Sequence, residues 1–125
     1  VLSDPEGSIL AGGGRIFFAR SGDRVVGTCA LMQDEPGVFE LTKMAVDPKA
    51  QGLGIGRKLI ERAIAEFKAM GARQLFLETN TKLAPAIRLY ESVGFEHQPK
   101  VREGTHYSRA NVYMIWRGDS AASAQ

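Results

Sequence analysis

The stretch Asp47-Pro48-Lys49-Ala50-Gln51-Gly52-Leu53-Gly54-Ile55-Gly56-Arg57 decides how this chain folds. In front of it, the apolar and β-branched residues within 39–46 predict a strand, which ends at Asp47-Pro48 because proline cannot donate a hydrogen bond to a β-ladder. Behind it, apolar residues recur at helical spacing from Ile55 to Phe67, which predicts an amphipathic helix with one buried face. The stretch is therefore a glycine-rich loop between a strand and a helix.

The three alternating glycines of this loop predict a binding site for a phosphate or a pyrophosphate. Glycine lets the backbone approach a ligand closely and adopt positive φ angles. The first N–H groups of a helix have no acceptor inside the helix, and the helix dipole favours an anion there. Arg57 and Lys58 add positive charge nearby. The alternative is a turn that needs glycine only for packing, and three glycines at this position disfavour it.

Two other phosphate-binding motifs fit the loop less well. A nucleotide P-loop needs a glycine directly before its lysine, whereas here Arg57 precedes Lys58. A dinucleotide-binding loop needs Gly-x-Gly-x-x-Gly, and the residue three positions after Gly54 is Arg57. Glu78 lies at a distance where an acidic residue binds a ribose in that fold, so a nucleotide-binding module stays open as an alternative.

The other predicted elements give an α/β (α+β) fold. A second helix is expected from about Pro85 to Gly94. Further strands are predicted over 15–20, 25–32, 75–79, 95–97 and 111–116. Strand 39–46, helix 55–70 and strand 74–80 form a right-handed βαβ unit with parallel strands. We therefore expect a mixed, mostly antiparallel central sheet with one parallel pair and helices on both faces.

Length and composition restrict the class of protein. The 125 residues suit one domain, expected over 1–117, and the small residues of 118–125 predict a disordered tail. Hydrophobic residues make up 44% and charged residues 24%, as in an ordinary folded protein. The 16 basic and 14 acidic residues are scattered, which gives no argument for nucleic acid. No apolar run approaches the roughly 18 residues of a membrane span. We expect a cytoplasmic protein.

Few residues suit a metal site or a disulfide. Cys29 is the one cysteine, and His97 and His106 are the two histidines. A single cysteine excludes an internal disulfide and a multi-cysteine zinc site, so we expect no metal. Cys29 lies in an apolar strand with no histidine in a recognisable motif beside it, and we interpret it as a small buried residue rather than a nucleophile.

Three motifs in register resemble the GNAT family of N-acetyltransferases, whose members bind acetyl-CoA. Residues 51–56 match Gln/Arg-x-x-Gly-x-Gly/Ala, and Met44-Ala45-Val46-Asp47-Pro48 precedes this loop as in the family. Residues 86–95 match Ala-x-x-Leu-Tyr-x-x-x-Gly-Phe. The resemblance covers about residues 40–95 and implies a GNAT-like acyl-CoA N-acyltransferase fold. Because only about 14 residues precede the first clear strand, we expect the fold to be shortened at its N-terminus, with those residues resembling the end of the family's helical region.

The resemblance implies which residues hold the cofactor. The backbone amides of 52–57 would bind the pyrophosphate of CoA, and main-chain groups of Met44, Ala45 and Val46 would bind the pantetheine arm. Asn80 would contact the pantetheine or the acceptor, or else only cap the following helix. The implied cofactor-binding set is Met44, Ala45, Val46, Gln51, Gly52, Leu53, Gly54, Ile55, Gly56, Arg57 and Asn80.

The resemblance also implies the reaction, in which a primary amine attacks the thioester of acetyl-CoA directly in a ternary complex. Tyr90 falls at the family's general-acid position, and a tyrosine with an ordinary pKa of about 10 suits proton transfer to a departing thiolate. A plain core aromatic is the alternative for Tyr90. Glu40 lies where many members of the family have a catalytic carboxylate, which makes it a candidate base. Glu78 is the alternative base. The remaining interpretation is that Glu40 is only a solvated strand glutamate.

Three functions stay open on this basis. The first is an acetyl-CoA-dependent N-acetyltransferase, which Tyr90 favours because binding alone does not require it. The second is a non-catalytic acyl-CoA-binding or regulatory domain on the same fold, and the third is the nucleotide-binding module. The amine acceptor, a small molecule or a protein amine, is not identified, although basic residues within 99–110 suggest an acidic or carboxylate-bearing acceptor. A homodimer through the terminal strands is compatible with the sequence.

Overall fold

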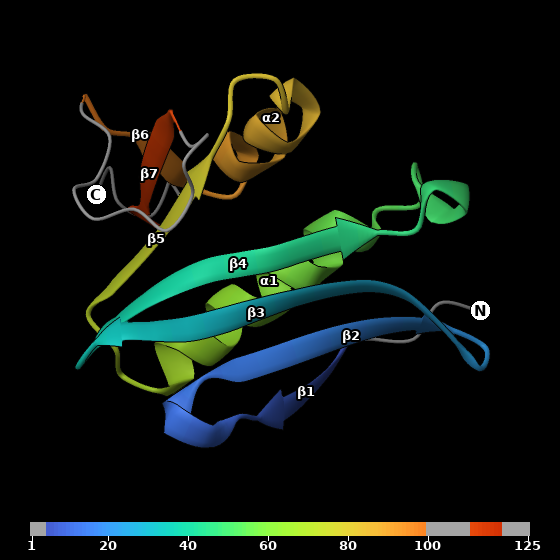
Figure 1. Cartoon of the computed structure of the whole chain (residues 1–125), viewed down its shortest axis with the longest axis horizontal. Coiled ribbons are helices and arrows are strands. Elements are labelled where there is room, and N and C mark those ends of the chain that lie inside the picture. The colour runs from blue at the N-terminus through green and yellow to red at the C-terminus, as the bar shows by residue number, and fades with distance from the viewer. Residues whose placement is uncertain (1–4, 100–110, 119–125) are drawn as a thin grey trace. The chain divides into compact units, whose positions relative to one another are not determined.

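A computed structural model describes residues 5–99 and 111–118 of the chain (Figure 1). The chain divides into two compact units, Val1–Arg73 and Gln74–Gln125. The predicted single domain over 1–117 stays a prediction. The basic loop residues of 100–110 and the predicted tail residues 119–125 lie outside the described residues.

The first unit is an antiparallel meander of four strands with one helix on one face. The strands are β1 (Glu6–Ile9), β2 (Arg15–Ser21), β3 (Arg24–Glu35) and β4 (Val38–Val46), and each pairs with the next. Helix α1 (Ile55–Ala69) follows the short 3₁₀ turn η2 (Pro48–Ala50) and packs against β2, β3 and β4. Figure 1 shows α1 behind these strands.

The core of this unit lies between α1 and the sheet, as the helical spacing predicts. The buried residues of α1 are Ile55, Leu59, Ile60, Ala63, Ile64 and Phe67. They face the fully buried Phe17, Cys29 and Leu31 of the sheet. At Gly27 an added Cβ atom would lie 2.9 Å from side-chain atoms of both Ile55 and Leu59, so glycine there lets the first turn of α1 approach β3 closely.

The second unit is a three-stranded antiparallel sheet with one helix. Its elements are β5 (Gln74–Thr79), α2 (Ala84–Ser92), β6 (Phe95–His97) and β7 (Val112–Trp116). Strand β7 pairs with both β5 and β6, and α2 packs against β6. The Trp116 indole N–H donates to the Val93 carbonyl at 2.8 Å, which ties the last strand to the end of α2.

The amino-terminal segment differs from the prediction. Residues 6–9 form strand β1, which pairs antiparallel with β2, and a 3₁₀ turn η1 (Ala11–Gly13) follows. The expectation that this segment resembles the end of a helical region is wrong. All four residues of β1 are exposed, so no alternation of buried and exposed residues marks the strand in the sequence. The strand pairs with β2 through backbone hydrogen bonds and through the exposed ion pair between Arg20 and Glu6. Among the described residues, neither helix is both long and apolar enough to cross a membrane.

Candidate functional site

The glycine loop lies in the first unit, and its backbone is open to solvent. Residues 51–54 are all exposed, and Gly52 and Gly54 have positive φ angles of 88° and 77°. A Cβ atom at either glycine would meet no other atom within 4 Å. The backbone conformation, rather than a lack of space, therefore requires glycine at both positions.

Helix α1 begins directly after this loop, and no side chain among the described residues caps its N-terminus. The first turn holds no acidic residue, and the first helical bond runs from the Lys58 N–H to the Gly54 carbonyl at 3.1 Å. Helical geometry leaves the N–H groups of Ile55, Gly56 and Arg57 without an acceptor inside the helix. Together with the helix dipole, these groups favour an anion at this end.

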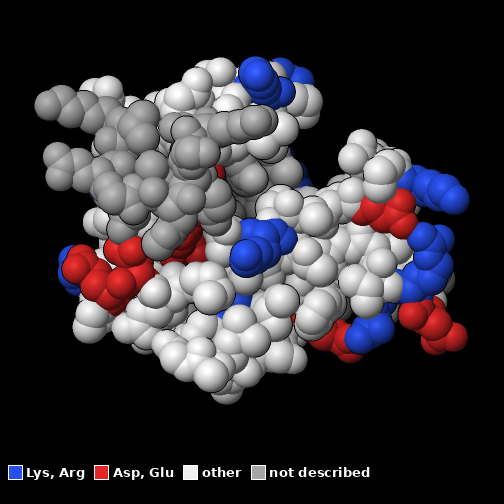
Figure 2. Space-filling model, in the orientation of Figure 1, with Lys and Arg blue, Asp and Glu red and all other residues white. Residues whose placement is uncertain are grey.

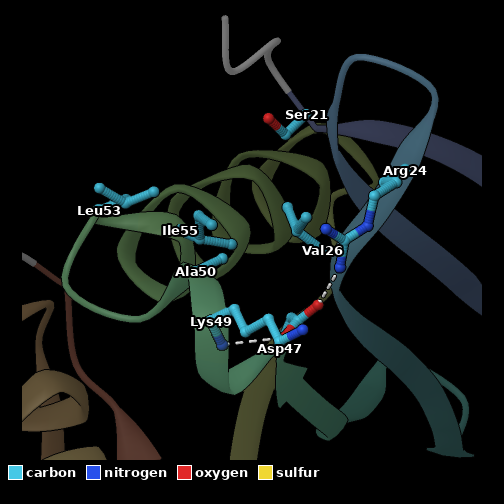
Figure 3. A pocket seen from close by; sticks show the side chains of 8 residues that line it. All are labelled: Ser21, Arg24, Val26, Asp47, Lys49, Ala50, Leu53 and Ile55. Atoms are coloured by element: carbon cyan, nitrogen blue, oxygen red, sulfur yellow. Dashed lines mark hydrogen bonds and ion pairs between the residues drawn. The ribbon is translucent and has the colours of Figure 1, made fainter.

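Asp47 joins the start of the loop to the β2–β3 turn. Its N–H donates to the Val26 carbonyl at 2.8 Å, and its carbonyl accepts from the Ala50 N–H at 2.8 Å. Its carboxylate accepts from the Lys49 N–H at 2.9 Å and from the Arg24 guanidinium at 2.5 Å. Figure 3 shows Arg24 reaching from the turn to Asp47 at one side of a pocket of about 390 Å³. The residues that line this pocket are Ser21, Arg24, Val26, Asp47, Lys49, Ala50, Leu53 and Ile55.

Charged side chains of both signs gather around this end of the first unit. Figure 2 shows them at the right of the view, near the β2–β3 turn, whereas the face over β2 and β3 is largely uncharged. Two exposed ion pairs belong to this end, Arg24 with Asp47 and Arg20 with Glu6. Exposed pairs contribute little to stability by themselves, but they set the local charge near the loop.

Strand β4 contains a bulge directly before Met44, Ala45 and Val46. The register shifts here, because Thr28 pairs with Ala45 while Ala30 pairs with Thr42. Lys43 has a φ angle of 58°, and among the described residues it is the one non-glycine residue with a positive φ. Its carbonyl accepts a hydrogen bond from the Thr28 hydroxyl at 3.1 Å. Bulges redirect backbone groups and are frequent beside functional sites, and lysine gave no signal of one in the sequence.

Glu40 lies on β4, opposite Met32 of β3, and is 5% exposed. Leu41 pairs with Leu31, which faces α1, so the alternation of side chains places Glu40 on the other face of the sheet. One of its carboxylate oxygens is shielded from solvent. The interpretation of Glu40 as a solvated strand residue is therefore wrong, because its carboxylate is buried.

Tyr90, Asn80 and Glu78 all belong to the second unit. The Tyr90 ring is buried on α2 and packs edge-to-face on Phe95, with 6.0 Å between ring centroids. The Asn80 side-chain oxygen accepts from the Lys82 N–H at 2.8 Å, which forms an Asx turn before α2. The interpretation of Asn80 as a cap of the following helix is wrong, because the N-cap residue of α2 is Leu83 and no side chain among the described residues caps that helix. The contact of Asn80 with the pantetheine or the acceptor stays a prediction. Both carboxylate oxygens of Glu78 are buried on β5.

The sequence matches one family over most of its length. The model of the acetyltransferase (GNAT) family matches residues 4–95. The chain belongs to the GNAT family. The N-alpha-acetyltransferase RimI of Mycobacterium tuberculosis (strain H37Rv) is 35% identical to it over 102 residues, which cover 79% of this chain and 63% of RimI. The chain thus spans less than two thirds of the length of this curated relative.

Solved structures of acetyltransferases share the fold. A GNAT acetyltransferase from Staphylococcus aureus Mu50 superposes with a TM-score of 0.76 at 25% identity, covering 86% of this chain and 70% of its own. A Bacillus subtilis acetyltransferase solved in complex with CoA has a TM-score of 0.69 at 24% identity, covering 82% of this chain and 76% of its own. These likenesses confirm the predicted fold class, an α/β fold of the GNAT acyl-CoA N-acyltransferase type.

Cys29 does not have the properties of a nucleophile in this GNAT chain. Its side chain is fully buried, and its sulfur lies 3.6 Å from the Leu59 carbonyl oxygen in α1. Burial raises the pKa of the Cys29 thiol to about 12. The thiol therefore keeps its proton at neutral pH, whereas a nucleophile needs the thiolate. The prediction that Cys29 is a small buried residue is confirmed.

Residues that hold metal ions do not gather in the part of the chain that the structure describes. There, no group of three His, Cys, Asp or Glu side chains is placed to bind a metal ion. His106 lies outside the described residues. The expectation that this GNAT chain uses no metal stays a prediction.

Proposed function

We propose that the chain is an acetyl-CoA-dependent N-acetyltransferase, which transfers the acetyl group to a primary amine of an acceptor by direct attack in a ternary complex. The observation that carries the proposal is the exposed glycine loop at an uncapped helix N-terminus in a chain of the GNAT family. The CoA in the Bacillus subtilis neighbour supports the choice of ligand. We also propose a cytoplasmic location and no nucleic-acid partner, the latter because the 16 basic and 14 acidic residues are nearly balanced.

The loop fits the charged part of acetyl-CoA. Its backbone N–H groups, the helix dipole and the absence of an acidic residue in the first turn of α1 all favour a pyrophosphate. The empty space next to Gly52 and Gly54 leaves room for a close approach. We assign the pyrophosphate to 52–57, with Gln51 preceding it, and the pantetheine arm to the backbone of Met44, Ala45 and Val46 after the bulge. Asn80 is retained as a further contact.

Acetyl-CoA supplies a thioester, whose carbon–sulfur bond breaks as the amine nitrogen forms a bond to the acetyl carbon. The chain's own residues would move two protons. Tyr90 would donate one to the departing thiolate, and Glu40, or alternatively Glu78, would accept one from the amine, directly or through water. The burial of Glu40 supports its choice, because a base that serves one bound amine is shielded from bulk water.

Release of the CoA thiol tests this proposal. With acetyl-CoA and a panel of amines and peptides, we expect amine-dependent thiol release, followed with a thiol reagent, and an acceptor heavier by one acetyl group in mass spectrometry. CoA binding without thiol release from any acceptor would instead support the non-catalytic acyl-CoA-binding domain. A thermal shift with ATP or NAD, but none with acetyl-CoA, would support a nucleotide-binding module.

Tyr90→Phe separates the general-acid role from packing. Phenylalanine keeps the ring that packs on Phe95 and removes only the hydroxyl. We expect kcat to fall by about 10²-fold or more while the KM for acetyl-CoA stays unchanged, because the proton is needed in the transition state. Tyr113→Phe removes a hydroxyl from β7 of the same unit and is the matched control. An equal kcat for Tyr90→Phe and the native chain would assign Tyr90 to the core alone.

Glu40→Gln tests the proposed base. We expect the rate to fall more at low pH than at high pH, because at high pH a larger share of the amine has already lost its proton. The affinity for acetyl-CoA should stay unchanged. The measurement is the pH–rate profile at saturating acetyl-CoA. A profile identical to that of the native chain would remove Glu40 from the mechanism and make Glu78→Gln the next variant.

A further inference from the structure

The proposed pyrophosphate loop has few contacts of its own. Residues 51–54 are exposed, and two of the four are glycines with positive φ. Glycine loses more conformational freedom on ordering than any other residue. A loop that must be ordered on binding therefore binds more weakly than one that is held ready beforehand.

Asp47 is the residue that holds this loop at its start. Both of its main-chain polar groups are used, towards Val26 of β3 and towards Ala50 of η2. Both of its carboxylate oxygens are used as well, one by the Lys49 N–H and the other by Arg24. The bonds with Val26 and Arg24 tie Asp47 to β3 and so fix where the chain leaves the sheet. The bonds from the Ala50 and Lys49 N–H groups fix the turn η2, which leads to Gly52.

The pocket beside the loop explains why the ion pair is important here. This pocket of about 390 Å³ lies between the β2–β3 turn and the glycine loop. On the side of the pocket, apolar packing therefore does not join the turn to the loop. Figure 3 shows the Arg24–Asp47 contact bridging them, with Leu53 at the opposite side of the pocket. Leu53 is 66% exposed and so adds little packing of its own.

The charge of Asp47 also indicates that its carboxylate serves to hold the loop. A carboxylate five residues before Gly52 opposes the binding of a phosphate, because like charges repel. A carboxylate in that place is useful only if its oxygens serve another purpose. Here both oxygens accept hydrogen bonds, and the guanidinium of Arg24 offsets the charge.

We infer that Asp47 is a positioning residue for acetyl-CoA, which acts through Arg24 and η2 to hold the glycine loop in its binding conformation. This inference rests on the proposed function. It assigns to Asp47 and Arg24 an effect on cofactor affinity and none on the chemical step.

The experiment compares four variants of the full chain. Asp47→Ala loses both carboxylate contacts, Asp47→Asn keeps an oxygen for the Lys49 N–H but loses the ion pair, and Arg24→Ala loses only the ion pair. The control, Glu6→Ala, removes another exposed ion pair of the same unit, with Arg20 at 2.8 Å. The probes are CoA in titration calorimetry and acetyl-CoA in steady-state kinetics, and urea unfolding reports stability.

We expect Kd for CoA and KM for acetyl-CoA to rise about tenfold in Asp47→Ala, the effect of losing a capping bond together with an ion pair. Asp47→Asn and Arg24→Ala should each raise both constants about threefold, and Glu6→Ala should leave them unchanged. The kcat at saturating acetyl-CoA should stay constant in all four variants.

The outcomes distinguish this inference from the proposed function. If the native chain does not bind CoA, the proposed function fails and the inference falls with it. If the native chain binds CoA and the Asp47 and Arg24 variants bind it equally well, only the inference is overturned. A lower kcat with unchanged affinity would also overturn it. If Asp47→Ala does not fold, Asp47→Asn and Arg24→Ala decide the matter.

Discussion

In its carboxyl-terminal half α1 is fixed to the sheet of the first unit by charged side chains, whereas its amino-terminal end meets an exposed glycine loop. Glu66 accepts from Arg15 of β2 at 2.9 Å and from Arg62 at 3.2 Å, and the Arg62 guanidinium lies 5.1 Å from the centre of the Phe17 ring. At the other end, Gly52 and Gly54 have few neighbours. The comparison shows a rigid element that presents a polar, accessible loop, the usual arrangement for binding residues.

Two glycines, one at each end of α1, give the sharpest test of this difference. Gly54 precedes the helix and Gly71 follows it, with φ angles of 77° and 69° and no atom within 4 Å of an added Cβ. Valine at either position forces a branched residue into the left-handed region, at a cost of roughly 1–2 kcal/mol in unfolding free energy. We expect Gly54→Val also to weaken CoA binding more than tenfold, and Gly71→Val to leave it unchanged. Calorimetry with CoA measures the affinity of each variant, and urea unfolding measures its stability. Equal CoA affinities of Gly54→Val and Gly71→Val would show that the two ends of α1 do not differ in function.

The buried thiol of Cys29, which contacts Leu59 of α1, predicts that the protein loses stability at alkaline pH. Between pH 9 and 12 the unfolded thiol ionises while the folded one keeps its proton, since its pKa is raised to about 12. The folded state then binds more protons, so stability falls as pH rises, by about 1.4 kcal/mol per pH unit from this group. Cys29→Ala lacks this effect. Urea unfolding at pH 7, 9 and 10 should therefore show the native chain losing more stability than the variant, and parallel losses would contradict the buried thiol.

Glu66→Gln should reduce the stability of the fixed end of α1 by less than the substitutions above. The hydrogen bond from Arg15, followed by the contact with Arg62, lowers the pKa of Glu66, so its stabilisation is present above the unfolded pKa of about 4.3 and is lost as pH falls through the lower folded pKa. At pH 7 we expect a loss of about 1 kcal/mol in unfolding free energy.

The control for Glu66→Gln is Glu61→Gln, whose partner Arg57 lies 3.8 Å away on the exposed face of the same helix. Glu61→Gln should lower the free energy of unfolding by less than Glu66→Gln does. Thermal or urea unfolding at pH 7 and pH 3 checks both variants. A difference between Glu66→Gln and the native chain that persists unchanged at pH 3 would exclude the ionic origin of the effect.

Much of the fold followed from local patterns. The spacing of the apolar residues gave the buried face of α1 correctly, and the alternating glycines gave the loop before it. Strand β1 was not predicted, because an exposed edge strand shows no alternation of buried and exposed residues. The burial of Glu40 was also hidden, since β4 buries both of its faces over 38–41.

The candidate site was predictable where it depends on residue type and not where it depends on tertiary contact. The positive φ angles at positions 52 and 54 require glycine, and the two glycines are visible in the sequence itself. The bond from Arg24 to Asp47 joins residues 23 positions apart, and only the folded hairpin brings them together. The bulge at Lys43 is imposed by pairing with β3, so the residue itself gives no sign of it.

Lys43 also bears on how this protein tolerates change. A lysine with a positive φ stores conformational strain, of order 1 kcal/mol or more, which glycine in the same place would release. A search for heat-resistant variants would therefore favour glycine at position 43. Glycine would also free the backbone just before the three residues proposed to hold the pantetheine arm. Selection for thermostability should therefore favour glycine at position 43, whereas selection for turnover should favour lysine.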